Sequence, residues 1–336
     1  MKKTIRNMVE GFGPSGFEDG IRKRIRAEIR GCSEMPHVDA MGNLLALRKG
    51  TAKKRKTIMV AAHMDEIGVM VSYIDKNGFL RAAALGGVSP TYELGGRVQF
   101  ENGVVGVIHT EKPKKAGEAP SMRSLYIDVG ASSANDCPVQ VGDVGVFLQP
   151  MVEIGDKLVS KAMDDRIGCA VMIQVMRELK DKPLPHDVCF AFTTQEEVGL
   201  RGAVTGAYGI QPDLGVALDV THSCDTPEPT QKMDVGLGKG AAIKIKDSGM
   251  IVQPWVKNWM IDTAERGNIP YQREVLDGGT TDAAAIQKSR AGVATGCISI
   301  PCRYIHSPSE MVCYSDILAA VKLLKVLLLK PRFVKP

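Results

Sequence analysis

The chain has 336 residues, of which 44% are hydrophobic and 24% charged, which is ordinary for a globular protein of two modest domains or one large one and argues against disorder or a membrane protein. Its 43 Lys and Arg against 38 Asp and Glu give a net charge of only +5, and nucleic-acid binding is not favoured because it needs clustered basic residues with stacking aromatics. The eight cysteines contain no CxxC pair, so we expect buried free thiols in a reducing, cytoplasmic compartment.

The first 67 residues are predicted to begin an α/β domain. No apolar stretch of signal-peptide length follows Met1. Isoleucines at 21, 25 and 29 recur at helical spacing and predict an amphipathic helix over residues 16–30 with a solvated basic face. Two strand-like runs follow at 43–49 and 57–65, separated by an exposed polar turn. The second run is nearly all apolar, as is typical of an interior strand covered on both faces.

From about residue 68 to 156 the pattern changes to short alternating runs separated by glycine-containing turns, which predict a small antiparallel barrel or sandwich. Helix–strand alternation returns after residue 157. We expect helices at 165–180, 253–267 and 281–288 and strands at 187–195, 214–220 and 292–301, with a loop between the first two strands. The chain therefore divides into an α/β domain of residues 1–67 and 157–336 and an inserted β domain of residues 68–156.

The chain is expected to end in a helix. Ser315 and Asp316 precede the apolar run ILAAVKLLKVLLL and look like a helix start. This run is too short to span a bilayer and is interrupted by Lys322 and Lys325. We therefore predict a buried or amphipathic terminal helix and no membrane partner.

Polar side chains that can bind metals stand next to the predicted strands, where open α/β sheets bind their ligands. They are His63 and Asp65, Asp164 and Asp165, Glu196 and Glu197, Asp219 with His222 close behind, and His306. Any one of them alone would be explained as a helix cap or a solvated charge. Together they favour a site with imidazole and carboxylate donors, which suits zinc, cobalt or manganese.

Two short-range patterns indicate how the roles could be divided. Asp65 can accept the second ring N–H of His63, which would fix the tautomer and make the imidazole a better metal ligand. Glu196 and Glu197 are adjacent on an extended or turning backbone, so their side chains diverge. One of these carboxylates can then bind a metal while the other acts as a general base.

Several motifs resemble those of the tetrahedral dinuclear-metal aminopeptidases, a family of glutamyl and deblocking aminopeptidases with some members labelled endoglucanases. The motifs are HMDEIG (63–68), KAMDDR (161–166), TTQEEVGLRGA (193–203), ALDVT (217–221), GGTTDAAAI (278–286) and IPCRYIHSPSEM (300–311). They occur in the family's order and spacing over nearly the whole chain.

The resemblance implies a role for each matching residue. His63 and Asp219 would bind one metal, Glu197 and His306 the other, and Asp164 would bridge both, with Asp165 as the fallback. Asp65 would support His63, and Glu196 would be the general base. The two divalent ions per subunit would be zinc or cobalt.

The resemblance also implies a fold and an assembly. The expected fold is a zinc-exopeptidase-like α/β/α catalytic domain with an inserted small β-barrel used in oligomerisation. The expected partners are peptide substrates and further copies of the chain, as dimers that assemble into a tetrahedral dodecamer. The sequence departs from the family pattern at GGVSPTYELGGRV (86–98), where a GGxDxQ-like element is expected.

Other activities remain open from the sequence. The same metal centre would serve a carboxypeptidase or an amide deacylase. An endoglucanase would also use two carboxylates, but its groove is normally lined with aromatics, and Trp255 and Trp259 fall in one predicted helix where core packing explains them better. Arg201 or Lys246 near the site would favour acidic N-terminal residues, whereas an apolar lining from residues 222–250 would not.

Overall fold

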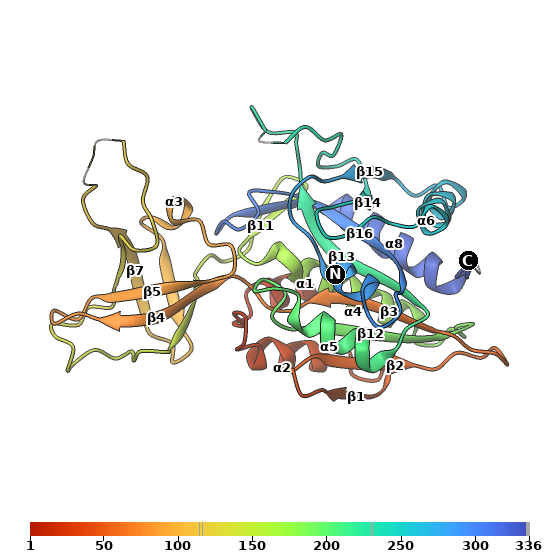
Figure 1. Cartoon of the computed structure of the whole chain (residues 1–336), viewed down its shortest axis with the longest axis horizontal. Helices are drawn as coiled ribbons and strands as arrows, with labels where there is room; N and C mark the ends of the chain where they lie inside the picture. The colour runs from red at the N-terminus through yellow and green to blue at the C-terminus, as the bar shows by residue number, and fades with distance from the viewer. Residues whose placement is uncertain (114, 116, 230, 334–336) are drawn as a thin grey trace.

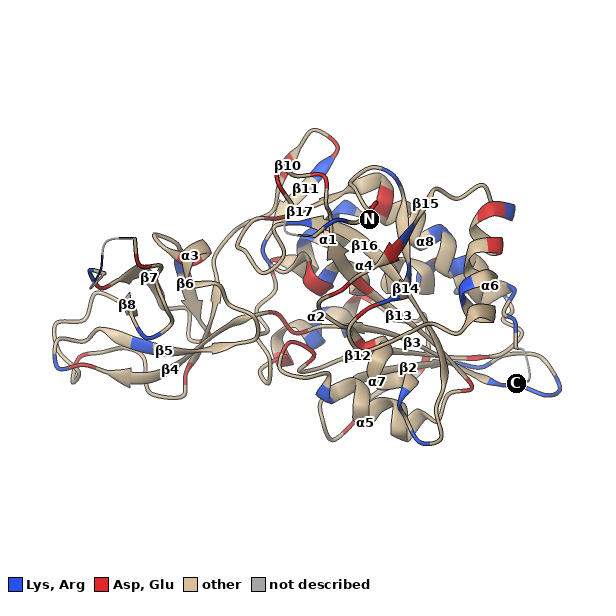
Figure 2. Cartoon of the chain, turned by 45° about the horizontal axis from the view of Figure 1, so that its top comes forward, with Lys and Arg blue, Asp and Glu red and all other residues tan. Residues whose placement is uncertain are grey.

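The computed structural model describes residues 1–113, 115, 117–229 and 231–333 (Figure 1). A small β-barrel lies beside a larger α/β body, and the chain passes from the body into the barrel and back again (Figure 1). Lys and Arg are spread over both parts, in keeping with the small net charge (Figure 2). The predicted α/β fold with an inserted β-barrel is confirmed.

Within the described residues, eleven strands form the large sheet of the body. They are β1 (Glu34–Val38), β2 (Leu44–Arg48), β3 (Thr57–His63), β10 (Val152–Ile154), β11 (Lys157–Ser160), β12 (Asp187–Thr193), β13 (Leu214–His222), β14 (Ala241–Lys246), β15 (Tyr271–Val275), β16 (Ala294–Arg303) and β17 (Glu310–Cys313). The central strands β12, β3, β13 and β16 run parallel to their neighbours in that order. Their carboxyl ends therefore meet at one edge of the sheet.

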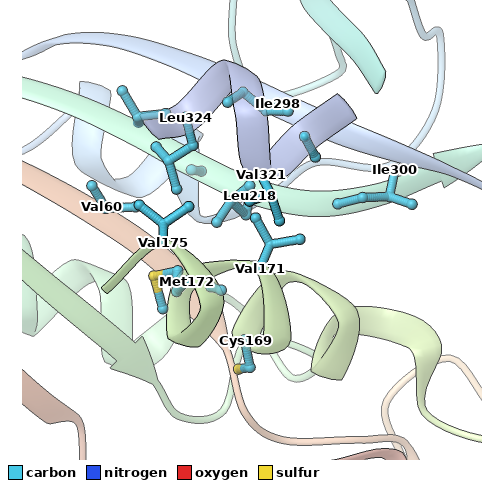
Figure 3. Packing of buried hydrophobic residues seen from close by; sticks show 14 of the residues in the cluster. Val60, Cys169, Val171, Met172, Val175, Leu218, Ile298, Ile300, Val321 and Leu324 are labelled. Carbon is cyan, nitrogen blue, oxygen red and sulfur yellow. The ribbon is translucent and has the colours of Figure 1, made fainter. Parts of the chain in front are cut away.

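Helices cover the sheet on both faces. They are α1 (Lys2–Val9), α2 (Asp19–Glu28), α4 (Met163–Leu179), α5 (Arg201–Ile210), α6 (Pro254–Arg266), α7 (Asp282–Gln287) and α8 (Tyr314–Leu329). On one face, Val171 and Val175 of α4 meet Leu218 of the sheet and Leu324 of α8 in the main core (Figure 3). On the other face α5 and α7 cover a smaller apolar cluster. Burial of these apolar side chains supplies the main driving force for the fold.

The barrel is closed in the order β4-β5-β8-β7-β6-β9 and contains the short helix α3 (Pro90–Glu93). Its strands are β4 (Gly68–Ile74), β5 (Leu80–Leu85), β6 (Arg97–Phe100), β7 (Val105–Thr110), β8 (Leu125–Asp128) and β9 (Val144–Phe147). Its interior is filled by apolar side chains such as Leu80, Phe100 and Ile127. Because full closure leaves no free sheet edge, six short strands suffice to form a stable unit.

One local prediction was wrong, and the predicted terminal helix is confirmed with a start that differs by one residue. The segment after β12, expected as a loop, contains α5, whose sequence RGAVTGAYGI has three glycines that conceal the helical pattern. Gly202 belongs there because a Cβ atom would collide with the backbone of Thr194. Helix α8 begins at Tyr314 with Cys313 as its N-cap, one residue before the expected start. Asp316 instead accepts hydrogen bonds from the amides of Gly238 (2.7 Å) and Gly240 (2.8 Å).

Other expectations agree with the structure. Trp259 is buried in α6 and Trp255 packs against the same core, as predicted. All eight cysteines are free, and six of them are buried. No helix in the described part of the chain combines the length and the apolar content needed to cross a bilayer.

Candidate active site

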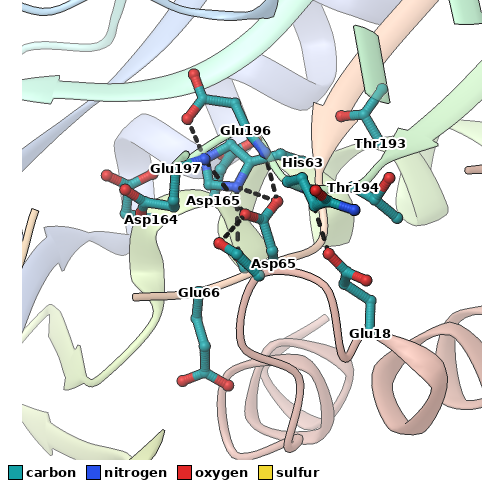
Figure 4. Close-up of polar contacts among 12 residues, drawn as sticks. Glu18, His63, Asp65, Glu66, Asp164, Asp165, Thr193, Thr194, Glu196 and Glu197 are labelled. Atoms are coloured by element: carbon teal, nitrogen blue, oxygen red, sulfur yellow. Dashed lines mark hydrogen bonds and ion pairs between the residues drawn. The ribbon is translucent and has the colours of Figure 1, made fainter. Parts of the chain in front are cut away.

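The carboxyl ends of the parallel strands bring the predicted site residues together, and Figure 4 shows those that come from the end of β3, the start of α4 and the turn after β12. His63 ends β3, Glu196 and Glu197 lie in the turn after β12, Asp219 lies in β13, and His306 follows β16. A further residue, Asp164, comes from the first turn of α4, where its extended backbone (φ −73°, ψ 112°) departs from the helix. Five separate segments thus deliver imidazole and carboxylate groups to one place.

Asp164 lies between the two imidazoles. Its Oδ1 is 2.9 Å from Nε2 of His63, and its Oδ2 is 3.4 Å from Nε2 of His306. Burial disfavours a charged Asp164, but the hydrogen bonds with His306 and His63 outweigh it and lower the pKa of this carboxyl. Each carboxylate oxygen of Asp164 therefore faces a different histidine.

The two glutamates after β12 diverge as predicted. Oε2 of Glu197 is 3.1 Å from Nε2 of His306, whereas Oε2 of Glu196 is 3.9 Å from Nε2 of His63. Burial raises the pKa of both carboxyls. Burial alone would lower the pKa of His306, but its hydrogen bonds with Asp164 and Glu197 raise that pKa to about 12. The raised pKa of His306 therefore reflects its direct contacts with the carboxyl groups of Asp164 and Glu197.

Asp65 contacts more than the histidine. Its Oδ1 is 3.5 Å from Nδ1 of His63, and that ring nitrogen also lies 3.2 Å from the carbonyl of Asp65. In addition, the Asp65 carboxylate accepts hydrogen bonds from the backbone amides of Glu196 (3.0 Å) and Glu197 (3.2 Å). A single buried carboxylate thus joins the His63 strand to the glutamate turn.

Two overlapping groups of side chains could each hold a metal ion. One consists of His63, Asp165 and Asp219, and the other of His63, Asp164 and Glu197, with the ligand atoms of each group within 4.8 Å of one another. Asp165 Oδ1 accepts the amide of Gly168 (3.0 Å) at the start of α4, which occupies one of its oxygens. The structure therefore brings both members of the Asp164–Asp165 pair to the site.

Glu310 and Asp282 were missed as site residues, although both lie inside the quoted motifs. Glu310 is 2% exposed and accepts hydrogen bonds from the amides of Asp164 (3.0 Å) and His306 (2.8 Å). Asp282 is buried at the start of α7 and accepts a hydrogen bond from the hydroxyl of Thr193. The sequence signals that could have identified them are the position of Glu310 four residues after His306 and the position of Asp282 inside the motif GGTTDAAAI.

A pocket of about 330 Å³ opens onto this cluster. Asp164, Glu196, Glu197, Asp219 and His306 line its floor, and His222, Lys244, Leu200, Leu276 and Ile305 line its walls. The two basic residues considered from the sequence lie elsewhere: Arg201 donates to the side chain of Gln195, and Lys246 pairs with Asp277. The basic group that does line the pocket, Lys244, is 2.5 Å from Glu274.

The known proteins that resemble this chain are described as aminopeptidases in three separate comparisons. A family model described as M42 glutamyl aminopeptidase matches residues 42–323. A putative aminopeptidase of Acetivibrio thermocellus is 48% identical over 314 residues, covering 93% of both chains. An aminopeptidase structure from Desulfurococcus kamchatkensis superposes with a TM-score of 0.93 at 41% identity, covering 97% of this chain and 94% of the other.

Two further solved structures bear on assembly and activity. The Pyrococcus horikoshii TET1 peptidase, which can assemble into a tetrahedron or a large octahedral shell, has a TM-score of 0.88 at 32% identity and covers 98% of this chain and 99% of its own. A Thermotoga maritima protein called an endoglucanase has a TM-score of 0.81 at 33% identity, covering 96% of both chains.

Proposed function

Because the chain belongs to the M42 glutamyl aminopeptidase family and is therefore a peptide-bond hydrolase, we propose that it removes N-terminal residues from peptides with two divalent metal ions and Glu196 as the general base. The resemblance that its motifs carry is confirmed by the family match. The single observation that carries the proposal is the concentration of carboxylates around His63 and His306 beside the pocket.

The donor set fits divalent cations. Oε1 of Glu197 is buried and has no hydrogen-bond partner among the described residues, so it is free to bind a cation. Burial and the charge of Asp164 raise the pKa of Asp219 well above its usual value, which reflects like charges held close together away from water. Carboxylate oxygens and imidazole nitrogens are ligands that zinc and cobalt accept.

We assign the ligands as the motifs imply. His63 and Asp219 would hold one ion, Glu197 and His306 the other, and Asp164 would bridge them. The contacts of Asp164 with both histidines and of Glu197 with His306 support this assignment. Asp165 is the alternative to Asp164, but one of its oxygens already accepts the amide of Gly168.

When bound, two divalent ions would polarise the scissile carbonyl and lower the pKa of a water molecule. Glu196 lines the pocket beside His63 and can take the proton of that water and return it to the leaving amine. Asp65 would keep His63 oriented and would hold the turn that carries Glu196. The acidic pocket floor also suits the protonated amine at the N-terminus of a peptide.

A carboxypeptidase or amide deacylase would use the same centre, and the pocket geometry alone does not separate it from an aminopeptidase. An endoglucanase is less well supported. Its two carboxylates would flank a sugar without metal ligands between them, whereas here the imidazoles of His63 and His306 lie among the carboxylates.

The test is metal depletion followed by reconstitution. Chelation should abolish cleavage of aminoacyl nitroanilides, and about two equivalents of Zn²⁺ or Co²⁺ per chain should restore it. Acetylation of the substrate amine should block cleavage. Cleavage of the acetylated substrate would favour a deacylase or carboxypeptidase, and cellulose hydrolysis that survives chelation would contradict the proposal.

We further propose that the chain forms a homo-oligomer through the inserted barrel, up to a dodecamer. Tyr73, Tyr92 and Val107 of the barrel are 58%, 58% and 48% exposed, so large apolar side chains are available on its surface for contact with another copy. The insertion would correspond to residues 68–156 without β10, which pairs with β11 in the large sheet. Light scattering of the wild type and Val107→Glu would test this assembly.

The free cysteines support a cytoplasmic location.

A further inference from the structure

The segment between α1 and α2 is fixed in place by two buried cations, Lys161 just before α4 and Arg166 in its first turn. Arg166 donates to the carbonyls of Gly11 and Gly13, both at 3.1 Å, and Lys161 donates to the carbonyl of Gly11 at 3.2 Å. Arg166 is fully buried and Lys161 is 6% exposed. Because these hydrogen bonds are charge-assisted and shielded from water, the segment has a defined position.

The same segment pairs with the chain beyond β3. The amide of Glu66 donates to the carbonyl of Gly13 (3.1 Å), and the amide of Ser15 donates to the carbonyl of Glu66 (3.3 Å). The hydroxyl of Ser15 then donates to Oδ2 of Asp65 at 2.6 Å. The segment therefore reaches the carboxylate that contacts both His63 and the glutamate turn.

Glu18, three residues further on, contacts that turn directly. Its side chain is 3% exposed, and Oε1 accepts hydrogen bonds from the amides of Gly16 (2.7 Å) and Gln195 (3.1 Å) (Figure 4). Gln195 has a left-handed backbone (φ 52°), which is unfavourable for a residue with a Cβ atom. The hydrogen bond from its amide to Glu18 offsets part of that cost.

Three successive amides of the turn are thus bound by two buried carboxylates. Glu18 accepts the amide of Gln195, and Asp65 accepts the amides of Glu196 and Glu197. The backbone of the turn is left-handed at Gln195, directly before the two glutamates. The two carboxylates therefore hold the turn in this conformation by accepting its three amides. Loss of Glu18 would release Gln195 and allow the Glu196 carboxylate to shift.

We propose that Glu18 is a positioning residue for the general base, acting through the backbone of Gln195. This inference rests on the proposed function, in which Glu196 is the general base and its position affects the rate. The Glu18 carboxylate hydrogen-bonds to the amides of Gly16 and Gln195 rather than to a proposed metal ligand, and it fixes the direction in which the turn presents Glu196.

The test compares Glu18→Ala and Glu18→Gln in the metal-loaded full-length protein. A misplacement of about 1 Å can cost on the order of 100-fold in rate, so Glu18→Ala should lower kcat about 10- to 100-fold with KM within about twofold. Glu18→Gln keeps an oxygen that can accept both amides and should recover most of kcat. Asp19→Ala, which removes the neighbouring exposed carboxylate, is the matched control.

Two further readouts separate positioning from a general loss of structure. Metal content should stay at the wild-type level in Glu18→Ala, while amide hydrogen exchange should accelerate in the peptide that contains residues 193–197. If Glu18→Ala does not fold, Glu18→Asp, which shortens the reach by one methylene, replaces it in the same comparison.

Wild-type kcat or unchanged exchange in the Glu18→Ala variant would overturn the inference, as would loss of metal parallel to the loss of activity. Failure of the proposed function has a different signature. The wild type itself would then cleave no peptide substrate, whereas hydrogen exchange would still report whether Glu18 orders the turn.

Discussion

The backbone of Gly87 lies against the imidazole of His306, so that a Cβ atom on residue 87 would come within 2.7 Å of Cε1 and even closer to Nδ1. The neighbouring Gly86 has a left-handed backbone (φ 80°) and lies over the side chain of Glu197. The chain between β5 and α3 therefore packs against two residues of the candidate site. The sequence element that departs from the family pattern begins at this contact.

This contact predicts that Gly87→Ala will impair catalysis without unfolding the protein. The added methyl group must displace the His306 ring, so kcat/KM should fall by about 100-fold, as expected when a reacting group moves by about 1 Å. Peptide hydrolysis and metal content should be measured together, because a displaced His306 should also weaken one metal site.

Gly209→Ala is the control for this substitution. Gly209 lies in α5 with no atom near its added Cβ, so alanine should leave activity unchanged and raise stability by about 0.5–1 kcal/mol. Normal activity of Gly87→Ala would show that the insertion leaves His306 free to move.

The adjacent glutamates predict two distinguishable losses. Glu196→Gln should lower kcat by about 10²- to 10⁴-fold, the usual contribution of a general base, with the metal content unchanged. Glu197→Gln should instead lose the ion held with His306, because it removes an anionic ligand 3.1 Å from Nε2. Metal analysis beside hydrolysis assays checks both. If Glu196→Gln loses metal and Glu197→Gln keeps it, the two roles are exchanged.

The strand-end residues could be predicted because their position depends on a simple rule. His63, Asp219 and His306 follow or end apolar runs that read as interior strands, and parallel strands bring their carboxyl ends together. The divergence of the Glu196 and Glu197 side chains also followed from local backbone geometry.

The supporting residues could not be predicted in the same way. Ser15 and Glu18 reach the site over more than 45 residues of sequence, and only the packing of the segment before α2 shows their partners. Helix α5 was missed because its three glycines weaken the helical pattern, although the close contact of Gly202 with the backbone of Thr194 accounts for only one of them. Such tertiary contacts leave no periodic signal in the sequence.

The buried cations near the site predict a large effect on stability. Glu66 is 2.6 Å from Nζ of Lys161 and 3.1 Å from Nη2 of Arg166, and all three side chains are buried. Glu66→Gln would leave both cations without their anion, so the free energy of unfolding should fall by about 3–5 kcal/mol. Urea denaturation measures this change.

The exposed pair between Lys2 and Glu153 is the matched control, since both side chains are 42% exposed. Glu153→Gln should change stability by less than about 1 kcal/mol. Equal effects of the Glu66 and Glu153 substitutions would show that the buried cluster is solvated.

A carboxyl group inside the barrel is the least expected feature of the insertion. Glu93 is 1% exposed, and neither carboxylate oxygen has a hydrogen-bond partner among the described residues. Val69, Ile108 and Phe147 surround it. Burial raises the pKa of Glu93 to about 8, which means that the folded barrel disfavours the charged form.

Glu93→Leu should therefore stabilise the protein in a pH-dependent way. The folded pKa of about 8 lies above the ordinary value of 4.5, so ionisation destabilises the fold increasingly from about pH 4.5 to pH 8 and by a constant amount above that. The difference in unfolding free energy between Glu93→Leu and the wild type should grow over this range. Glu101→Gln, an exposed carboxylate of the same barrel, should show no such growth. Parallel stability curves for Glu93→Leu and the wild type between pH 5 and pH 9 would mean that the Glu93 carboxyl reaches water.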